Sequence, residues 1–575
     1  ENYAKSLRQL CDDDCEADPM PHPMYVVPMD AVLQMTELKP HEELLAEGVV
    51  IEFEAGYGKA AFLSHQWISS HHPDPRFEQM RVFQEAVVHM KIGLKNIPLD
   101  VFTETERPLE KGPSTAEMFS EPIFVWYDFF CCPQADACQL SKAIESIPAY
   151  IARCSLFFVL CPVIQQHGSS EVLGPRTWAE RGWCRAERTF RELSMQNSWI
   201  AIKSSKNVEV MSTSVASYGG SVGEGMFSQM EDLAKLSPVL GQRFRRKLMA
   251  YLRDRDFVSY RVLYNLHNFH MRGLPVDEVF DLPGFEPEAF GSFGSDRSLE
   301  ALTVASFLHQ NGLRHIRQVD EGGWTPLCYA AMNGDPVLVR GLLQQRANPN
   351  DQTRKQQKMV GLFPRISALA LCAFFRNHEA MRLLIDAGAS ISAGWEPPMC
   401  TAAWANCPTG IRILCEAGGD AMVPDVLGLP ALQHATGFGS VDAFQEIVAQ
   451  ASDAANLSYA LHWAMLFRGG SAHMVGALVE AKADLNEQLK LSPRTAMGAL
   501  CKLLGLLHRQ GESTHMRRFA YHANGATPLM IAVIAGQYEG AAALIRAGAE
   551  VGLQNDRGAL PVDMARELAA PSFLI

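Results

Sequence analysis

Short apolar runs alternate with amphipathic segments through residues 49–210. Four of these runs are bounded by polar residues and predict buried strands, at 60–63, 123–127, 156–160 and 199–202. Apolar residues at helical spacing predict helices over 76–94 and 141–153, the second with a kink at Pro148. Because strands and helices alternate, we expect an α/β domain with a parallel sheet flanked by helices.

A different pattern fills the C-terminal half, where one arrangement of apolar and turn residues recurs. Residues 322–350 and 525–552 both contain Thr-Pro-Leu-x-x-Ala, then a glycine, then a Leu-Leu or Leu-Ile pair before a turn. Degenerate copies begin at Ser367, Thr401, Pro430 and Tyr459. Thr-Pro begins a helix and glycine ends it, and one such helix pair cannot bury its apolar face unless neighbouring pairs stack. This half is therefore predicted to be an all-α solenoid.

The spacing of the copies indicates a family. Equivalent positions at Leu327, Leu369, Ala402, Leu432, Leu461, Leu529 and Val562 are separated by 42, 33, 30, 29, 68 and 33 residues. A period near 33 residues resembles the ankyrin repeat. The interval of 42 fits an insertion at 353–362, and that of 68 leaves either a decayed repeat or a long irregular loop near 486–522. The resemblance implies that the solenoid binds a protein partner, the alternative being that it only spaces or caps the N-terminal half.

Unusual polar and aromatic residues follow the predicted strands. Ser64-His65-Gln66-Trp67 ends the first strand, Asp128 begins the segment that runs to Gln134 after the second, and Arg181-Gly182-Trp183 leads to Glu187. Ligands of open α/β sheets bind outside the carboxyl ends of the strands. We therefore expect these residues to converge on one site.

Four motifs in this order resemble the TIR superfamily, and within it the TIR-like domains of the heterokaryon-incompatibility type. They are a first strand that ends in Ser64 near an aromatic residue, a Trp-x-Asp strand with Cys131 to Gln134 after it, a helix leading into an apolar strand over 144–160, and Arg-x-Trp-x-x-x-Glu at 181–187. Enzymes of the superfamily cleave NAD at the nicotinamide–ribose bond. The resemblance implies that Glu187 is the catalytic carboxylate and that Ser64, Trp67, Asp128 and Trp183 line a nucleotide site.

Two purely structural interpretations are alternatives to this one. Glu187 and Arg191 are spaced as an i,i+4 ion pair on a half-exposed helix, and Asp128 is equally explained as a loop cap. His65 and Gln66 also occupy positions where enzymes of the superfamily often have an aromatic residue and an arginine. Whether the domain is an enzyme is left open: we expect it to mediate assembly without catalysis, with NAD hydrolysis under control of the solenoid as the alternative.

Charge and composition narrow the choice of partners. The net charge of −13 argues against nucleic acid and anionic membranes, and the basic cluster at 243–255 is interpreted as a solvated helix face. The longest apolar stretch, 156–164, is too short to span a bilayer. Fourteen cysteines without a CxxC pair indicate a reducing compartment, and we expect a cytoplasmic protein. No cofactor or metal is predicted, NAD being a possible substrate only. The first residue is Glu1, so a removed targeting segment stays possible.

The predicted organisation has four parts: an N-terminal extension over 1–48, a TIR-like α/β domain over 49–210, a linker and helical connector over 211–297, and the ankyrin solenoid over 298–575. The glycines at 219–225 predict that the linker is flexible. The expected role is signalling or scaffolding, with a partner bound by the solenoid and self-association through the TIR-like domain.

Overall fold

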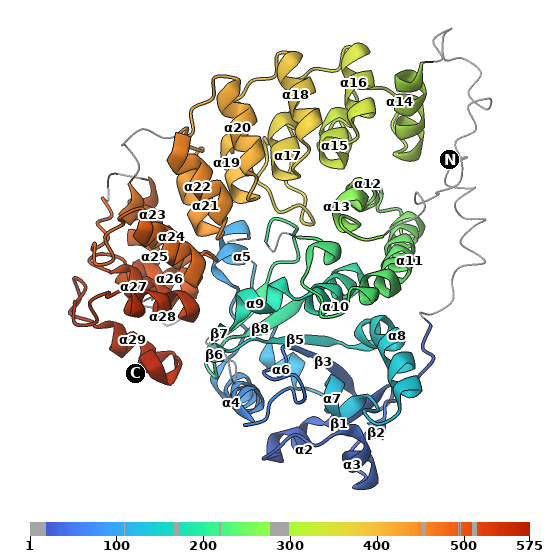
Figure 1. Cartoon of the computed structure of the whole chain (residues 1–575), viewed down its shortest axis with the longest axis vertical. Coiled ribbons are helices and arrows are strands. Elements are labelled where there is room, and N and C mark those ends of the chain that lie inside the picture. Colours follow the sequence, from blue (N-terminus) through green and yellow to red (C-terminus); the bar gives the residue numbers. More distant parts are fainter. Residues whose placement is uncertain are drawn as a thin grey trace. The chain divides into compact units, whose positions relative to one another are not determined.

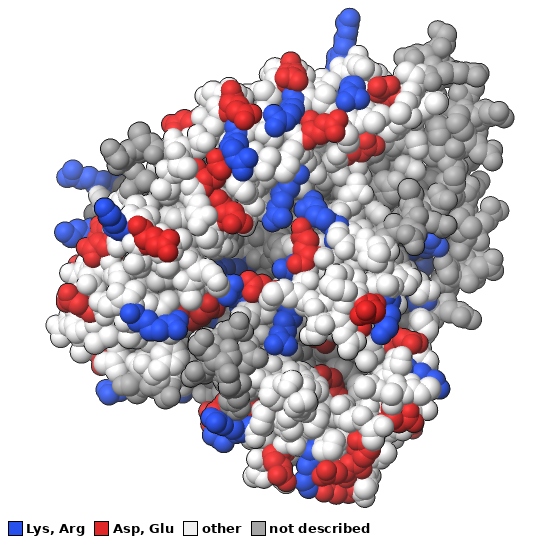
Figure 2. Space-filling view, viewed as in Figure 1, with Lys and Arg blue, Asp and Glu red and all other residues white. Residues whose placement is uncertain are grey.

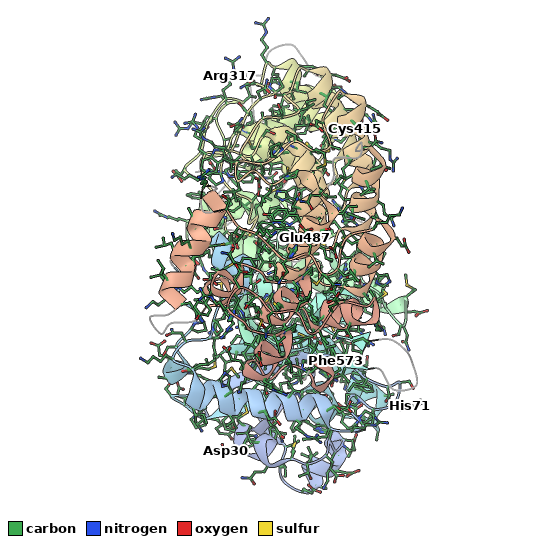
Figure 3. The ribbon with its side chains drawn as sticks, turned by 90° about the vertical axis from the view of Figure 1, so that its left-hand side faces the viewer. Asp30, His71, Arg317, Cys415, Glu487 and Phe573 are labelled. Carbon is green, nitrogen blue, oxygen red and sulfur yellow. The ribbon has the colours of Figure 1, made fainter. Side chains whose placement is uncertain are left out.

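The computed structural model describes residues 19–574, except 108–109, 166–171, 218–219, 276–297, 451–455, 493, 495 and 509–513. The chain divides into two compact units (Figure 1). The repeat unit contains Ser214–Gly223 and Leu233–Glu487, and the α/β unit contains Glu16–Thr213, Glu224–Asp232 and Gln488–Ile575. In Figure 3, Arg317 and Cys415 mark the repeat unit, whereas Asp30, His71 and Phe573 mark the α/β unit.

A seven-stranded sheet in the order β2-β1-β4-β3-β5-β8-β9 forms the centre of the α/β unit. The four strands expected from the sequence are parallel neighbours: β4 (Ile123–Trp126), β3 (Lys59–His65), β5 (Leu156–Leu160) and β8 (Trp199–Ile202). Phe62 pairs in register with Trp126 on one side and Phe157 on the other, and all three rings are stacked in the core. The prediction of a parallel α/β sheet is thus confirmed for these strands.

The edges of the sheet differ from the prediction because antiparallel strands complete it. These are β1 (Tyr25–Pro28), β2 (Ile51–Glu52) and β9 (Val208–Met211). Val26 and Val27 of β1 are fully buried, so the segment that we expected to be a mere extension supplies a strand of the sheet. Helices α2 (Met29–Gln34) and α3 (His41–Ala46) follow it.

Helices that position the site connect the strands. They are α4 (Glu78–Gly93), α5 (Val101–Glu106), α6 (Thr115–Met118), α7 (Asp128–Cys131), α8 (Ala137–Arg153), α9 (Pro175–Glu180) and α10 (Gly182–Leu193). A two-stranded antiparallel ribbon of β6 (Ile164–Gln165) and β7 (Val172–Leu173) precedes α9. Helix α8 contains Pro148, as expected, and Arg191 of α10 is fully buried.

The last helices of the chain belong to the α/β unit: α25 (Ala496–His508), α26 (His515–His522), α27 (Pro528–Ile534), α28 (Tyr538–Arg546) and α29 (Pro561–Glu567), with a short 3-10 turn η3 (Ser572–Leu574). Thr514 Oγ1 donates to Glu104 Oε1 at 2.5 Å, and Ser204 Oγ donates to the Leu568 carbonyl at 3.2 Å. Helices α25 and α26 pack against each other where the sequence left a decayed repeat or a loop, so this stretch contains a helix pair.

The repeat unit is built from helix pairs in two rows. The first row contains α15 (Pro326–Asn333), α17 (Ala368–Phe374), α19 (Pro398–Trp404), α21 (Ala431–Gly437) and α23 (Leu457–Leu466). The second row contains α14 (Leu299–Gln310), α16 (Pro336–Gln344), α18 (His378–Asp386), α20 (Pro408–Glu416), α22 (Val441–Gln450) and α24 (Ala472–Glu480). Thr325 caps α15 by accepting a hydrogen bond from the Cys328 amide, and Gly334 ends it at a φ of 85°. The Thr-Pro and glycine positions therefore act as the sequence pattern predicts.

The connector is helical after its first part. Helices α11 (Glu231–Arg253), α12 (Phe257–Asn265) and α13 (His267–His270) follow a short 3-10 turn, η1 (Val222–Glu224). Residues 214–217 are buried, whereas Gly219, one of the glycines for which a flexible linker is predicted, lies outside the described residues. Within the described residues, no helix is long and apolar enough to cross a membrane.

Candidate functional site

Ser64, near the end of β3, meets Glu187, in the middle of α10. Ser64 Oγ donates to Glu187 Oε2 at 2.6 Å, and it accepts from Trp178 Nε1 at 3.0 Å. Both Ser64 and Trp178 are buried. Because the indole fixes one side of the hydroxyl, the hydroxyl hydrogen is directed at the carboxyl group. Trp178 is a further residue of this site, and it lies outside the Arg-x-Trp-x-x-x-Glu motif, three residues before its first position.

The protonation state of Glu187 follows from this environment. Burial raises the pKa of Glu187 to about 8, the hydrogen bond from Ser64 opposes that rise, and the negative charge of Asp128 adds to it. Glu187 is therefore mainly a neutral acid at pH 7. A proton on this group leaves it able to donate a hydrogen bond, whereas stabilising a developing positive charge requires the ionised form.

Asp128 and Trp67 form a second contact beside the first. Trp67 Nε1 donates to Asp128 Oδ2 at 2.9 Å, and His65 Nε2 lies 3.3 Å from Asp128 Oδ1. The His65 ring is buried and stacks on Tyr127 with centroids 3.9 Å apart. Burial lowers the pKa of His65 despite the opposing effect of Asp128. The Asp128 carboxylate thus holds side chains of the β3 end, and the loop-cap interpretation does not describe it.

Trp183 takes part in a different set of contacts. Its Nε1 donates to Asp232 Oδ2 at 2.9 Å, in the segment Glu224–Asp232 of the same unit. That segment is joined to the start of α10 through Met226, whose carbonyl accepts from the Gly182 amide at 2.7 Å. A Cβ atom on Gly182 would collide with the Phe227 ring, so the covering segment lies directly on the helix. The indole N–H of Trp183 is therefore already used by this segment.

Arg191 excludes the surface ion pair that the spacing of α10 suggested. Its guanidinium donates to three backbone carbonyls, those of Cys154 at 2.7 Å, Ser155 at 3.1 Å and Ser198 at 2.9 Å. These carbonyls lie at the starts of β5 and β8, so Arg191 fixes α10 against the sheet. Glu187 is left to Ser64 rather than to Arg191, which corrects the i,i+4 interpretation.

Other chemistry near the site is limited. Cys184 Sγ lies 3.5 Å from the His65 carbonyl oxygen, and burial raises the pKa of this thiol well above its ordinary value. It therefore lacks the thiolate character of a nucleophile. Among the described residues, no three His, Cys, Asp or Glu side chains are grouped so that they could hold a metal ion.

Comparison with known proteins concerns the helical repeats. The family model described as "Ankyrin repeat" matches residues 322–354 and 524–556. The chain contains ankyrin repeats. The two matched segments hold the pairs α15–α16 and α27–α28, one pair in each unit. Ankyrin repeats are modules of protein–protein interaction, and their stacking creates extended binding surfaces.

Two solved structures that are similar to part of the chain are also ankyrin proteins. The ankyrin repeat domain of human ASB11 is 19% identical, with a TM-score of 0.30, over 43% of this chain and 93% of that domain. The ankyrin repeat domain of Bcl-3, described as a unique member of the IkappaB protein family, is 21% identical, with a TM-score of 0.28, over 44% and 96%. No curated protein matches the chain.

Proposed function

We propose that the protein is a cytoplasmic signalling or scaffolding protein in which the ankyrin repeats bind a protein partner and the TIR-like α/β unit assembles with other copies. The observation that carries the partner-binding half is an exposed apolar patch at the turns between repeats. Trp395 is 39% exposed, Val426 59% and Leu427 49%, and the Val426 amide donates to the Trp395 carbonyl at 2.9 Å. Neighbouring exposed apolar side chains of this size are typical of protein-binding surfaces.

The second row of helices has a charged surface instead. Ion pairs join successive repeats there, from Arg340 to Glu379 at 3.4 Å, from Arg382 to Glu416 at 3.6 Å and from Arg412 to Glu446 at 2.9 Å. Acidic and basic residues intermingle over the visible face (Figure 2). Such a mixed surface gives no field of one sign, which favours the patch of Trp395, Val426 and Leu427 as the partner surface and disfavours phosphate backbones.

The cysteines support the proposed compartment. All twelve in the described part of the chain are free, and most are buried. A protein that keeps this many thiols reduced fits the cytoplasm better than an oxidising compartment.

A photo-reactive amino acid placed at Val426 tests partner binding. In cells that express the full chain, we expect irradiation to give one or a few discrete cross-linked products. The same photo-reactive residue placed at Arg382, on α18 of the second row, is the matched control and should give none of these products. Identical products from both positions would contradict a specific surface at the turns.

NAD hydrolysis is the alternative function, and the meeting of Ser64 with Glu187 favours it. The expected activity is low at neutral pH because Glu187 is protonated and Trp183 is held by Asp232. If the ionised carboxylate is needed, nicotinamide release should rise with pH and reach half its maximum near pH 8, the pKa of Glu187.

The assay compares the wild type with Glu187→Gln at several protein concentrations between pH 6 and pH 9. Turnover that increases with concentration and disappears in the variant would support an assembly-gated hydrolase. Equal rates in both proteins, or none even at the highest concentration and pH, would leave assembly and partner binding as the function.

A further inference from the structure

A short stretch of the connector is bound by the repeats of its own chain. Residues Ser214, Val215, Ala216 and Ser217 are all buried, with at most 8% of each exposed. We call them the Ser214–Ser217 segment. The chain belongs to the α/β unit up to Thr213, enters the repeat unit for Ser214–Gly223, and returns to the α/β unit at Glu224. The segment is therefore a tethered insert in the repeat unit and no part of a repeat.

The insertion at 353–362, in the first repeat interval, provides the backbone contacts of this segment. The Val215 amide donates to the Met359 carbonyl at 2.9 Å, and the Ala216 amide donates to the Val360 carbonyl at 3.1 Å. Both the donors in the segment and the acceptors in the insertion are main-chain atoms. These bonds would form with any bound peptide of the same backbone shape.

Two side chains from other repeats donate hydrogen bonds to the carbonyl groups of the segment and to one of its hydroxyl groups. Trp404, at the end of α19, donates its indole N–H to the Ala216 carbonyl at 3.1 Å. Arg468, just after α23, donates to the Ser217 carbonyl and, at 2.5 Å, to the Ser217 hydroxyl. Together with the insertion, three separate parts of the repeat unit converge on four residues.

Ring contacts within the repeats hold Trp404 in place. Its ring stacks on Phe438 at 4.3 Å and meets Phe374 edge-on at 5.9 Å. The row continues from Phe438 to Phe467 at 6.1 Å, and from Phe467 to Trp463 at 5.2 Å. A row of packed rings fixes the direction of the indole N–H, so the site is preorganised for an acceptor at that position.

The site restricts the size of its occupant. Gly361 has a φ of 81°, and a Cβ atom there would collide with Oγ and Cβ of Ser214. The Ser217 amide donates to the Ser214 carbonyl at 3.0 Å, which closes a turn. The occupant is thus an uncharged turn of small residues, with a hydroxyl at the position that faces Arg468.

We propose that this surface is a peptide-binding site of the repeats and that the Ser214–Ser217 segment is a built-in occupant that a partner displaces. The partner segment is a short uncharged turn of small residues, with serine or threonine against Arg468 and a carbonyl against Trp404. This inference rests on the proposed function, because it names the kind of partner that the repeats bind. A tethered occupant competes at an effective concentration on the order of millimolar, so a free peptide binds the resting protein weakly.

The test uses a fluorescein-labelled synthetic peptide with the sequence of residues 212–218 and the full-length protein, measured by fluorescence anisotropy. Ala216→Arg places a long charged side chain in a buried position and should expel the tethered segment. We expect this variant to bind the peptide at least tenfold more tightly than the wild type. Adding Trp404→Phe, which keeps the ring stack and removes the N–H, should weaken that binding again by about tenfold.

Hydrogen exchange of the wild type covers the case in which Ala216→Arg fails to fold. With excess unlabelled peptide, the amides of Val215 and Ala216 should lose protection, because the peptide takes their carbonyl partners. A scrambled peptide in which arginine replaces the serines is the control and should leave that protection unchanged.

Three results would overturn the proposal: unchanged protection at saturating peptide, equal peptide affinity in wild type and a folded Ala216→Arg, or binding that ignores Trp404→Phe. Cross-linking at Val426 reports on partner binding independently. Discrete products there together with a failed peptide test would reject this site and leave the proposed function standing.

Discussion

The charge of Glu187 depends on residues from other elements of the fold. Its position four residues after Trp183 in α10 does not determine that charge, which follows from burial, from the hydrogen bond of Ser64 and from the charge of Asp128. The sequence predicts that Glu187, Ser64 and Asp128 converge on one site, and in the structure Ser64 Oγ lies 2.6 Å from Glu187 Oε2. It could not reveal that Arg191 turns away to the carbonyls of the sheet, because those acceptors are main-chain atoms that no motif encodes.

The raised pKa of Glu187 makes the stability of the α/β unit depend on pH. An ordinary glutamate in the unfolded chain has a pKa near 4.5, against about 8 here. Between these values the folded state binds more protons than the unfolded state, so stability falls as pH rises from about 4.5 to 8. Glu187→Gln removes this contribution. We expect the Tm of the wild type to fall further than the Tm of the variant between pH 6 and pH 8.5.

Differential scanning fluorimetry at matched ionic strength measures this difference. Ser64→Ala is a useful companion, because losing the hydrogen bond that lowers the pKa of Glu187 should move the drop in Tm to higher pH. Parallel curves for wild type and Glu187→Gln across the whole range would contradict a Glu187 whose pKa is raised in the folded state.

Individual elements were predictable where their own residues determined them. Strands β3, β4, β5 and β8 are continuous apolar runs, and the capped helix α15 carries its start and stop signals in its sequence. Strand β9 was missed because the polar residue Glu209 interrupts its apolar positions. Glu209 is nevertheless buried, because side chains from outside the strand contact its carboxylate. Those partners are Lys203 and His515, the second of which is 3.3 Å away from a carboxylate oxygen.

Helix α10 should depend on Arg191 for its attachment to the sheet. Arg191→Met fills a similar volume but leaves three carbonyls without their charged donor. We expect a loss of about 2–4 kcal/mol in the unfolding free energy of the α/β unit. Arg382→Met is the control, because Arg382 is exposed and makes one 3.6 Å ion pair, whose loss costs about 0–1 kcal/mol.

Urea denaturation, followed by the fluorescence of the buried tryptophans, measures both variants. The two transitions of the chain must be fitted separately, since a protein with two units need not unfold in a single step. An Arg191→Met variant no less stable than Arg382→Met would show that the carbonyls find other donors.

On the scale of the whole molecule, the sequence indicated two architectures but not their division along the chain. The repeat pattern runs to the last helices, so we expect from the sequence a solenoid over 298–575 with an irregular insertion near 486–522. Gln488–Ile575 nevertheless belongs to the compact unit that contains the sheet. Contacts such as Asn207 with the Tyr538 hydroxyl at 3.4 Å join residues far apart in sequence, and a repeat motif carries no signal for them.

Removing residues 488–575 should therefore damage the α/β unit more than the repeats that remain. Glu104, Ser204 and Asn207 would lose hydrogen-bond partners, and Glu209 would lose His515. We expect a lower Tm for the α/β transition and faster proteolysis within 16–213, with the repeat transition little changed. Tyr538→Ala in the full chain should shift the same transition in the same direction by a smaller amount.

Mass spectrometry of the early proteolytic fragments distinguishes the two units. Cleavage that begins instead within 298–487 in the shortened protein would contradict the assignment of the last helices to the α/β unit.

The alternation of the chain between units also sets an order of events during synthesis. The sheet is complete once Met211 has left the ribosome, but the helices that belong with it begin after Glu487. At about 5–20 residues per second, translation of the intervening part takes roughly 14–55 s. For that interval the nascent α/β unit exposes the surfaces that bury Tyr538 and His515 in the finished protein. We therefore expect chaperones that act on ribosome-bound intermediates to bind the nascent chain during this interval.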